Sequence, residues 1–179
     1  MFNQDKHRRR SIRLPGYDYS QEGWYYVTIC VQNMIPLFGE IKNGQIRLNA
    51  FGKIVEKEWI KTEILRSNIK LDEYVIMPNH VHGIIQILEN DDNRRGTMHS
   101  APTTEQFGRP VSNSIPTIIR SFKSTVTKQI NEMRNTHGTK IWQRNYWEHV
   151  IRNEKDLARI QKYIIENPIK WFDDKYFIK

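Results

Sequence analysis

Two apolar segments separated only by Pro78-Asn79 constrain the fold of this chain more than any other feature. Residues 69–77, IKLDEYVIM, and residues 80–88, HVHGIIQIL, are both rich in β-branched residues, which favour extended strands. Proline ends the first strand, and the second segment is its expected partner. The sequence therefore predicts two long neighbouring strands against which the remaining elements must pack.

The rest of the chain supplies further strands and helices. β-branched and aromatic runs predict strands, and apolar residues at helical spacing predict helices. Asn43-Gly44 suits a type I′ hairpin turn, and Asn153 is the expected N-cap of the last helix. The expected strands are 24–32 and 146–152, with a hairpin at 37–48, and the expected helices are 51–67, 112–135 and 153–167. This order predicts an α+β fold with an antiparallel sheet flanked by helices, compatible with a ferredoxin-like or RRM-like sandwich.

The 179 residues fit one domain. We expect a basic N-terminal arm over residues 1–16, a single domain over 17–179, and a long polar loop at 89–112 within it. No apolar run approaches the roughly 20 residues that cross a bilayer, and no apolar segment follows the basic N-terminus. Cys30 is the single cysteine, so a disulfide framework or a cysteine metal cage is excluded. These features predict a cytoplasmic protein without a membrane partner.

Positive charge is clustered along the chain. The net charge is +8 and the pI is about 9.6. Residues 1–13 contain five Lys and Arg against Asp5, and residues 113–162 contain ten Lys and Arg against four Asp and Glu. Such clusters favour a polyanionic partner, although a solvated basic surface is a common alternative. Aromatic residues make up 11% of the chain, and exposed rings can stack on nucleic-acid bases.

His80 and His82 stand two residues apart in an expected strand, so both imidazoles point to one face. Two neutral ring nitrogens can converge there on one cation. Gly83 removes a side chain beside them, which would let a ligand or backbone approach. Two histidines do not complete a site, and Mg²⁺ or Mn²⁺ would need oxygen donors as well. The alternative is a pair of solvent-facing or hydrogen-bonded histidines.

The last helix offers such a donor and a nucleophile. Tyr163 and Asn167 are four residues apart, so they share a helical face. The Asn167 amide oxygen suits a hard cation, and the Tyr163 phenol is a nucleophile once deprotonated. A half-buried core tyrosine and a helix-ending asparagine before proline are the alternatives. The spacing alone leaves both interpretations open.

The segments MPNHVHGII and IWQRNYWEHVIRNEKDLARIQKYIIENPIKW carry a resemblance to a known family. The first resembles the His-hydrophobic-His (HUH) motif of single-tyrosine transposases. The second resembles the C-terminal signature of the REP-associated tyrosine transposases, in which the helix after a Glu-His-x-Ile-Arg-Asn strand carries the nucleophilic tyrosine. The order and approximate spacing match over residues 11–171, and the long C-terminal block is the specific part.

The resemblance implies roles for individual residues. His80 and His82 would be metal ligands, and Tyr163 would attack the DNA backbone to give a 5′-phosphotyrosine and a free 3′-hydroxyl. Asn167 would complete a Mg²⁺ or Mn²⁺ site, where related single-tyrosine transposases place Gln; the adjacent Glu166 is a competing ligand. The implied substrate is single-stranded DNA with hairpins from palindromic repeats, and the implied protein is a monomer or a homodimer.

Several basic residues would then hold the DNA backbone: Arg8, Arg9, Arg10, Arg120, Lys123 and Arg152. Trp142, Tyr146 and Trp147 are candidates for base stacking, with core packing the expected role of at least one. His149 would line the site or act as a hydrogen-bonded structural histidine. Two other functions remain open, a hairpin-binding regulator without chemistry and a metallohydrolase whose histidine pair activates water.

Overall fold

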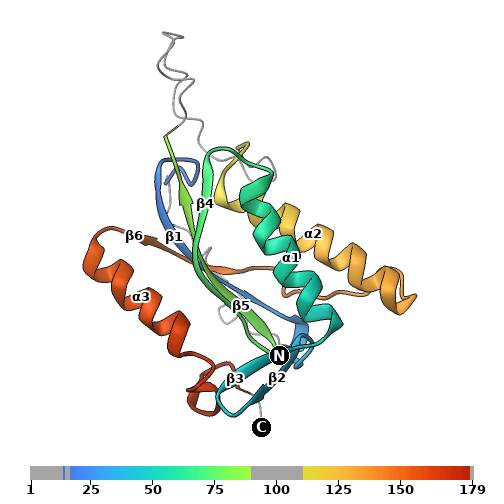
Figure 1. Ribbon diagram of the computed structural model, residues 1–179. Helices are drawn as coiled ribbons and strands as arrows, with labels where there is room; N and C mark the ends of the chain where they lie inside the picture. The colour runs from blue at the N-terminus through green and yellow to red at the C-terminus, as the bar shows by residue number, and fades with distance from the viewer. Residues whose placement is uncertain (1–13, 15–16, 90–110, 178–179) are drawn as a thin grey trace, which may run out of the picture.

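The computed structural model describes residue 14 and residues 17–89 and 111–177 (Figure 1). Four antiparallel strands form the main sheet in the order β4-β5-β1-β6. They are β1 (Gly23–Cys30), β4 (Ile69–Ile76), β5 (His80–Ile87) and β6 (Trp147–Ile151). With α1 (Ala50–Ile64) after β1 and α2 (Ile115–Arg134) after β5, the chain follows the β-α-β-β-α-β order of a ferredoxin-like fold. The predicted α+β class is confirmed.

The expected arm at 1–16 lies outside the described residues apart from Leu14, as does most of the loop expected at 89–112. The predicted turn at Asn43-Gly44 is present, with φ angles of 54° and 72°. It joins β2 (Gly39–Lys42) to β3 (Gln45–Leu48) in a separate two-stranded sheet.

The two central strands fix which side chains share a face. β1 pairs with β5 so that Cys30 lies opposite His80 and Thr28 lies opposite His82. β1 also pairs with β6, which places Thr28 opposite Trp147. Paired residues of neighbouring strands point to the same side of a sheet. His82, Thr28 and Trp147 therefore form one row across three strands.

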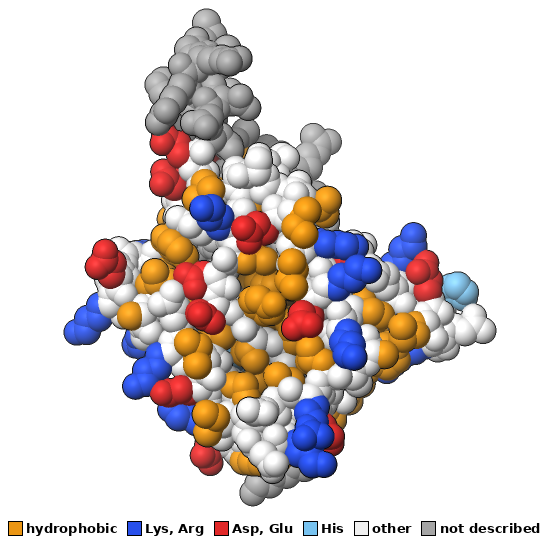
Figure 2. All heavy atoms as spheres, in the orientation of Figure 1, with side chains coloured by type: hydrophobic (Ala, Val, Ile, Leu, Met, Phe, Trp, Pro, Cys, Tyr) orange, Lys and Arg blue, Asp and Glu red, His pale blue; other side chains and the backbone are white. Residues whose placement is uncertain are grey.

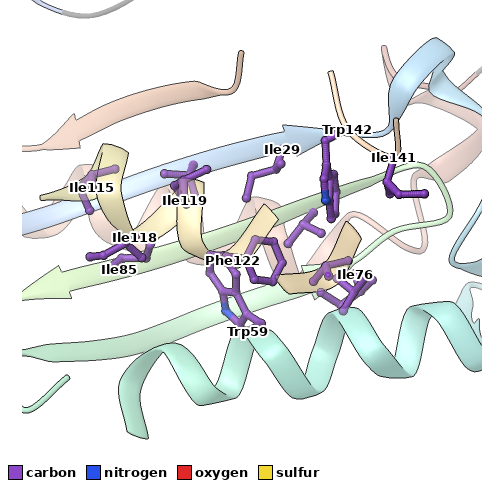
Figure 3. Close-up of a cluster of buried hydrophobic side chains, with 14 of the residues drawn as sticks. Ile29, Trp59, Ile76, Ile85, Ile115, Ile118, Ile119, Phe122, Ile141 and Trp142 are labelled. Atoms are coloured by element: carbon purple, nitrogen blue, oxygen red, sulfur yellow. The ribbon is translucent and has the colours of Figure 1, made fainter. Parts of the chain in front are cut away.

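Helices α1 and α2 cover the opposite face of the sheet and enclose the larger hydrophobic core. Figure 3 shows Phe122 of α2 next to Trp59 of α1, in the same cluster as Ile29 and Ile85 of the sheet. The rings of Trp59 and Phe122 are in edge contact, with centroids 5.3 Å apart. The buried apolar residues of α2, among them Ile118, Phe122 and Val126, recur at helical spacing and give that helix one apolar face.

The position of Gly83 corrects the role expected from the sequence. A Cβ atom there would lie 2.2 Å from Cζ2 of Trp59, so the missing side chain makes room for an indole ring of α1. This contact is on the core face, whereas the neighbouring histidines point to the other face. Gly83 therefore serves helix packing and does not open the sheet to a ligand.

Helix α3 (Glu154–Glu166) packs on the second face, and Figure 1 shows it on the side of the sheet away from α1 and α2. The predicted N-cap is confirmed, since Oδ1 of Asn153 accepts a hydrogen bond from the backbone N–H of Asp156 at 2.9 Å. Ile160 and Ile164 of α3 pack against Ile84 of β5 in the smaller core. This packing holds the last helix beside the strand that carries the two histidines.

The outer surface of the described residues mixes apolar and charged groups. Figure 2 shows apolar side chains gathered between α3 and α1, with acidic and basic side chains around them. Among the described residues, no helix has both the length and the apolar character to cross a membrane.

Candidate active site

His80 and His82 lie side by side on β5, and both are fully buried. Their Nε2 atoms are 3.0 Å apart. Two nitrogens that bind one cation at about 2.1 Å and at right angles would be separated by roughly 3 Å. The predicted convergence of the two rings is present, and their spacing suits a shared cation.

Asn79 fixes the orientation of the first ring. Its Nδ2 group donates to the carbonyl oxygens of Met34, at 3.0 Å, and Tyr176, at 2.8 Å. Its Oδ1 atom is therefore an acceptor and lies 2.8 Å from Nδ1 of His80. This nitrogen must carry the proton, which leaves the lone pair of Nε2 to face His82.

The second ring is held by hydroxyl groups from β1. The hydroxyls of Tyr26 and Thr28 each lie 2.8 Å from Nδ1 of His82. Either oxygen can accept the Nδ1 proton, which frees Nε2 for a cation. Hydrogen bonds of this kind set the tautomer and direction of a metal-binding imidazole.

The phenol of Tyr163 reaches the histidine pair from α3. Its oxygen is 3.4 Å from Nε2 of His82 and 3.4 Å from Oδ2 of Asp174. The side chain is 38% exposed, so it borders solvent as well as the site. The structure thus places the expected nucleophile next to the expected metal ligands, although the tyrosine lies 81 residues away in sequence from His82.

Two oxygen-bearing side chains complete the group. Asn167, at the C-terminal end of α3, is buried and donates from Nδ2 to Oδ2 of Asp174 at 2.8 Å. Its Oδ1 atom is buried and has no hydrogen-bond partner among the described residues. A buried oxygen without a partner is costly, and a hard cation would satisfy it. The residues present therefore fit a divalent metal.

Asp174 was not identified from the sequence. It follows the short 3₁₀ helix η4 (Trp171–Asp173), and one of its oxygens lies within 4.8 Å of ligand nitrogens from His80 and His82. A weak signal was available, since Asp173-Asp174 places carboxylates shortly after the tyrosine helix. Only the turn after α3 brings them back to the sheet.

Burial sets the protonation of these groups. It lowers the pKa of His80 to about 4. Burial and the neighbouring His80 hold the pKa of His82 well below its ordinary value of 6.5. Both rings are therefore neutral at pH 7, which is the form that binds metals. Burial, followed by the negative charge of Asp174, raises the pKa of Tyr163 above 10.0, so its phenol keeps its proton until a base or a cation acts on it.

The basic residues expected to hold DNA lie in different places. Arg8, Arg9 and Arg10 are outside the described residues. Arg120 and Arg152 are exposed, on α2 and just after β6. Lys123 is different, because its Nζ atom donates to the backbone carbonyls of Gln143 at 2.6 Å and Arg144 at 3.2 Å.

The remaining candidates divide between core and surface. Trp142 is buried against Phe38 and Phe122, and Tyr146 packs at the edge of that core. Trp147 is 40% exposed. Nε2 of His149 lies 2.6 Å from Oδ2 of Asp156, which ties β6 to α3.

Glu166, the competing metal ligand, lies 2.7 Å from Nζ of Lys170 and 3.7 Å from Nζ of Lys162. Asp174, in contrast, contacts the phenol of Tyr163, and Asn167 contacts Asp174. Of the three oxygen donors, Glu166 is therefore the one that the structure pairs with lysines.

No family model matches this chain. A Haemophilus influenzae protein without an assigned function is 40% identical over 177 residues, 99% of this chain and 97% of its own. A second H. influenzae protein, named as a REP-associated tyrosine transposase, is 30% identical over 154 residues, 86% of this chain and 74% of its own.

Two further proteins are similar to this chain, one in sequence and one in structure. The Escherichia coli REP-associated tyrosine transposase is 28% identical over 102 residues, 56% of this chain and 45% of its own. A solved structure of a REP-associated tyrosine transposase bound to a REP hairpin has a TM-score of 0.52 and 22% identity, and the match covers 89% of this chain and 72% of that one. The structural likeness shows a shared fold.

Proposed function

This chain belongs to the REP-associated tyrosine transposases, and on that basis we propose that it cuts and rejoins single-stranded DNA at hairpins through a covalent bond between Tyr163 and a DNA phosphate. The observation that carries the proposal is the phenol of Tyr163 lying 3.4 Å from a histidine whose Nε2 is 3.0 Å from that of a second histidine. The hairpin bound in the solved structure of similar fold supports hairpin DNA as the substrate.

His80, His82 and an oxygen from Asn167 or Asp174 would hold the metal. When bound, Mg²⁺ or Mn²⁺ would polarise the phosphate and stabilise the negative charge that grows on it during cleavage. Asn79, Tyr26 and Thr28 would hold the two rings in the tautomers that binding requires.

Tyr163 is the nucleophile. Its oxygen attacks phosphorus, the bond from phosphorus to the 3′ oxygen breaks, and the products are a 5′-phosphotyrosine and a free 3′-hydroxyl. The carboxylate of Asp174, 3.4 Å from the phenol oxygen, would take the phenol proton if Asn167 supplies the metal's oxygen ligand, and the departing 3′ oxygen gains a proton from water. Attack of a new 3′-hydroxyl on the phosphotyrosine reverses these steps and joins the strands without ATP.

The test is to incubate the protein with labelled hairpin oligonucleotides that have single-stranded flanks, with Mg²⁺ or Mn²⁺ or with EDTA, and to run a denaturing gel. We expect a covalent complex that needs metal and is absent from Tyr163→Phe, while gel-shift binding by that variant persists. Cleavage without an adduct would instead indicate a metallohydrolase. Binding without cleavage by the wild type would indicate a regulator.

A further inference from the structure

A cavity of about 610 Å³ opens beside the nucleophile, within the range of about 300–1,000 Å³ typical of ligand sites. Its walls come from β1, β6, α3 and the segment after α3, and they include Trp147, His149, Arg159, Tyr163, Asn167 and Lys170. Because Tyr163 lines the cavity, a nucleotide next to the reacting phosphate must pass into it or along its rim.

Trp147 is the feature of this cavity that core packing does not explain. All five tryptophans of the chain are described, and it alone is exposed, at 40%. The ring is nonetheless held in place. It makes an edge contact with Tyr26, at 5.4 Å between centroids, and its plane is parallel to that of His149 within 7°. A fixed aromatic ring open to solvent is suited to stacking on a base.

The register of the sheet sets the distance from this ring to the chemistry. Trp147 shares a row with Thr28 and His82, and two strand spacings separate Trp147 from His82, roughly 10 Å. The same face of four-stranded sheets presents aromatic residues to single-stranded bases in RNA-recognition modules. Here α3 packs on the β4 and β5 part of that face, and Trp147 of β6 stays exposed.

Charge favours a base over a phosphate inside the cavity. The lining contains the cations Arg159, Lys170 and Lys175 and the carboxylates Glu166, Asp173 and Asp174. Two of these cations are already paired, Arg159 with Asp156 and Lys170 with Glu166. The walls therefore do not form a field that would concentrate phosphates.

We infer that this cavity is a nucleobase subsite in which Trp147 stacks on the base of the nucleotide that flanks the phosphate attacked by Tyr163. The inference rests on the proposed function, because the phosphate position is defined by that chemistry. It assigns to β6 a part in choosing where the single strand is cut.

The test compares the DNA affinities of Trp147 variants for intact and abasic substrates. All proteins carry Tyr163→Phe, so that cleavage cannot interfere. A hairpin oligonucleotide with single-stranded flanks is made with one abasic site at each flank position in turn, and affinities are measured by fluorescence anisotropy. We expect one position at which the abasic site weakens binding by about 5-fold to 150-fold, the range for loss of one stacked base. In Trp147→Leu this penalty should vanish at that position only, and Trp147→Phe should retain most of it.

A control variant and the position of the cleaved phosphate test whether the effect belongs to the cavity. Phe172 is 69% exposed but does not line the cavity, so Phe172→Ala should leave the abasic pattern unchanged. The sensitive position should also adjoin the phosphate that the wild-type protein cleaves. Equal losses at every position in Trp147→Leu, or a sensitive position remote from the cut, would overturn the subsite. Failure of the wild type to form an adduct would instead count against the proposed function, since the binding comparison does not depend on cleavage.

Discussion

Single hydrogen bonds decide how the two imidazoles face each other, and Asn79 provides the clearest case. Asn79→Ala removes the acceptor for Nδ1 of His80. We expect Mn²⁺ to bind about 10-fold to 100-fold more weakly, the usual effect of losing such a support. The affinity can be measured by electron paramagnetic resonance of free Mn²⁺ during titration of the protein.

Asn79→Asp is the matched control for this experiment. It keeps an acceptor for His80 but loses both donors, which contact the carbonyls of Met34 and Tyr176. Its Mn²⁺ affinity should therefore stay much nearer to that of the wild type. Equal losses in the two variants would show that the backbone contacts, and not the ring orientation, are what the metal site requires.

The buried histidine pair also makes stability depend on pH. Burial lowers the pKa of both rings in the folded protein, whereas in the unfolded chain each returns to about 6.5. Below that pH the unfolded chain binds protons that the folded protein does not. The free energy of unfolding should therefore fall as the pH drops from about 6.5 toward 4, by up to about 1.4 kcal/mol per pH unit for each ring.

Urea denaturation in EDTA between pH 7.5 and 4.5 measures this dependence. The comparison is with the double variant His80→Asn/His82→Asn, in which the other titrating groups are unchanged. Its stability should vary less over the same interval. Parallel pH profiles for the two proteins would contradict the assignment of two neutral, buried imidazoles.

Between elements, the contact of α1 with the sheet depends on Gly83. A methyl group there would overlap the indole of Trp59, and overpacking of this kind costs about 1–3 kcal/mol. Gly83→Ala should therefore lower the free energy of unfolding by that amount. In combination with Trp59→Phe the loss should be smaller than the sum of the two single losses. Urea denaturation of all four proteins measures the coupling, and strict additivity would refute the contact.

The helices and strands were predicted well because each has a strong local pattern. The predicted helix at 153–167 is α3, at Glu154–Glu166, and the predicted strand at 80–88 is β5, at His80–Ile87. The N-cap at Asn153 has a purely local cause, a side chain bonded to a nearby N–H. The role of Gly83 could not be predicted, because it depends on a ring 24 residues earlier in the chain.

Over the whole molecule, we expect basic residues of α2 to have two different roles, one in DNA binding and one in stability. Arg120 is exposed, whereas Lys123 donates to two carbonyls, and burial lowers the pKa of Lys123 to about 8. Arg120→Met should change stability by less than about 0.5 kcal/mol and reduce the slope of log affinity against log salt by roughly 0.7 for single-stranded DNA. Lys123→Met should lower stability by about 1.5–3 kcal/mol.

Anisotropy titrations at several salt concentrations, together with urea denaturation, separate these effects. If Lys123→Met changed the salt slope and left stability intact, the structural role of Lys123 would be wrong. The sequence grouped both residues as positive charges because charge is visible in a sequence, whereas the carbonyls of Gln143 and Arg144 become partners only when the chain folds.

The sequence predicted some residues of the candidate site and missed others. Tyr163 lies beside His80 and His82, which is the arrangement that the family resemblance implies and that spacing alone left open. Their roles as metal ligands and nucleophile, and that of Asn167, stay predictions. Asp174 and Asn79 were missed because neither has a distinctive spacing. Asp174 reaches the histidines because the turn after α3 returns the chain to the start of β5. Asn79 is adjacent to His80 in sequence, but its amide is oriented by the carbonyls of Met34 and Tyr176, which only folding brings together.

Peptide mass spectrometry of the covalent complex tests directly whether the phenol of Tyr163 becomes joined to DNA. After nuclease and trypsin treatment, cleavage at Lys162 and Lys170 releases YIIENPIK, in which Tyr163 is the single tyrosine. We expect a nucleotide mass on that peptide. A nucleotide on the peptide YFIK, which contains Tyr176, or on any other peptide would contradict it.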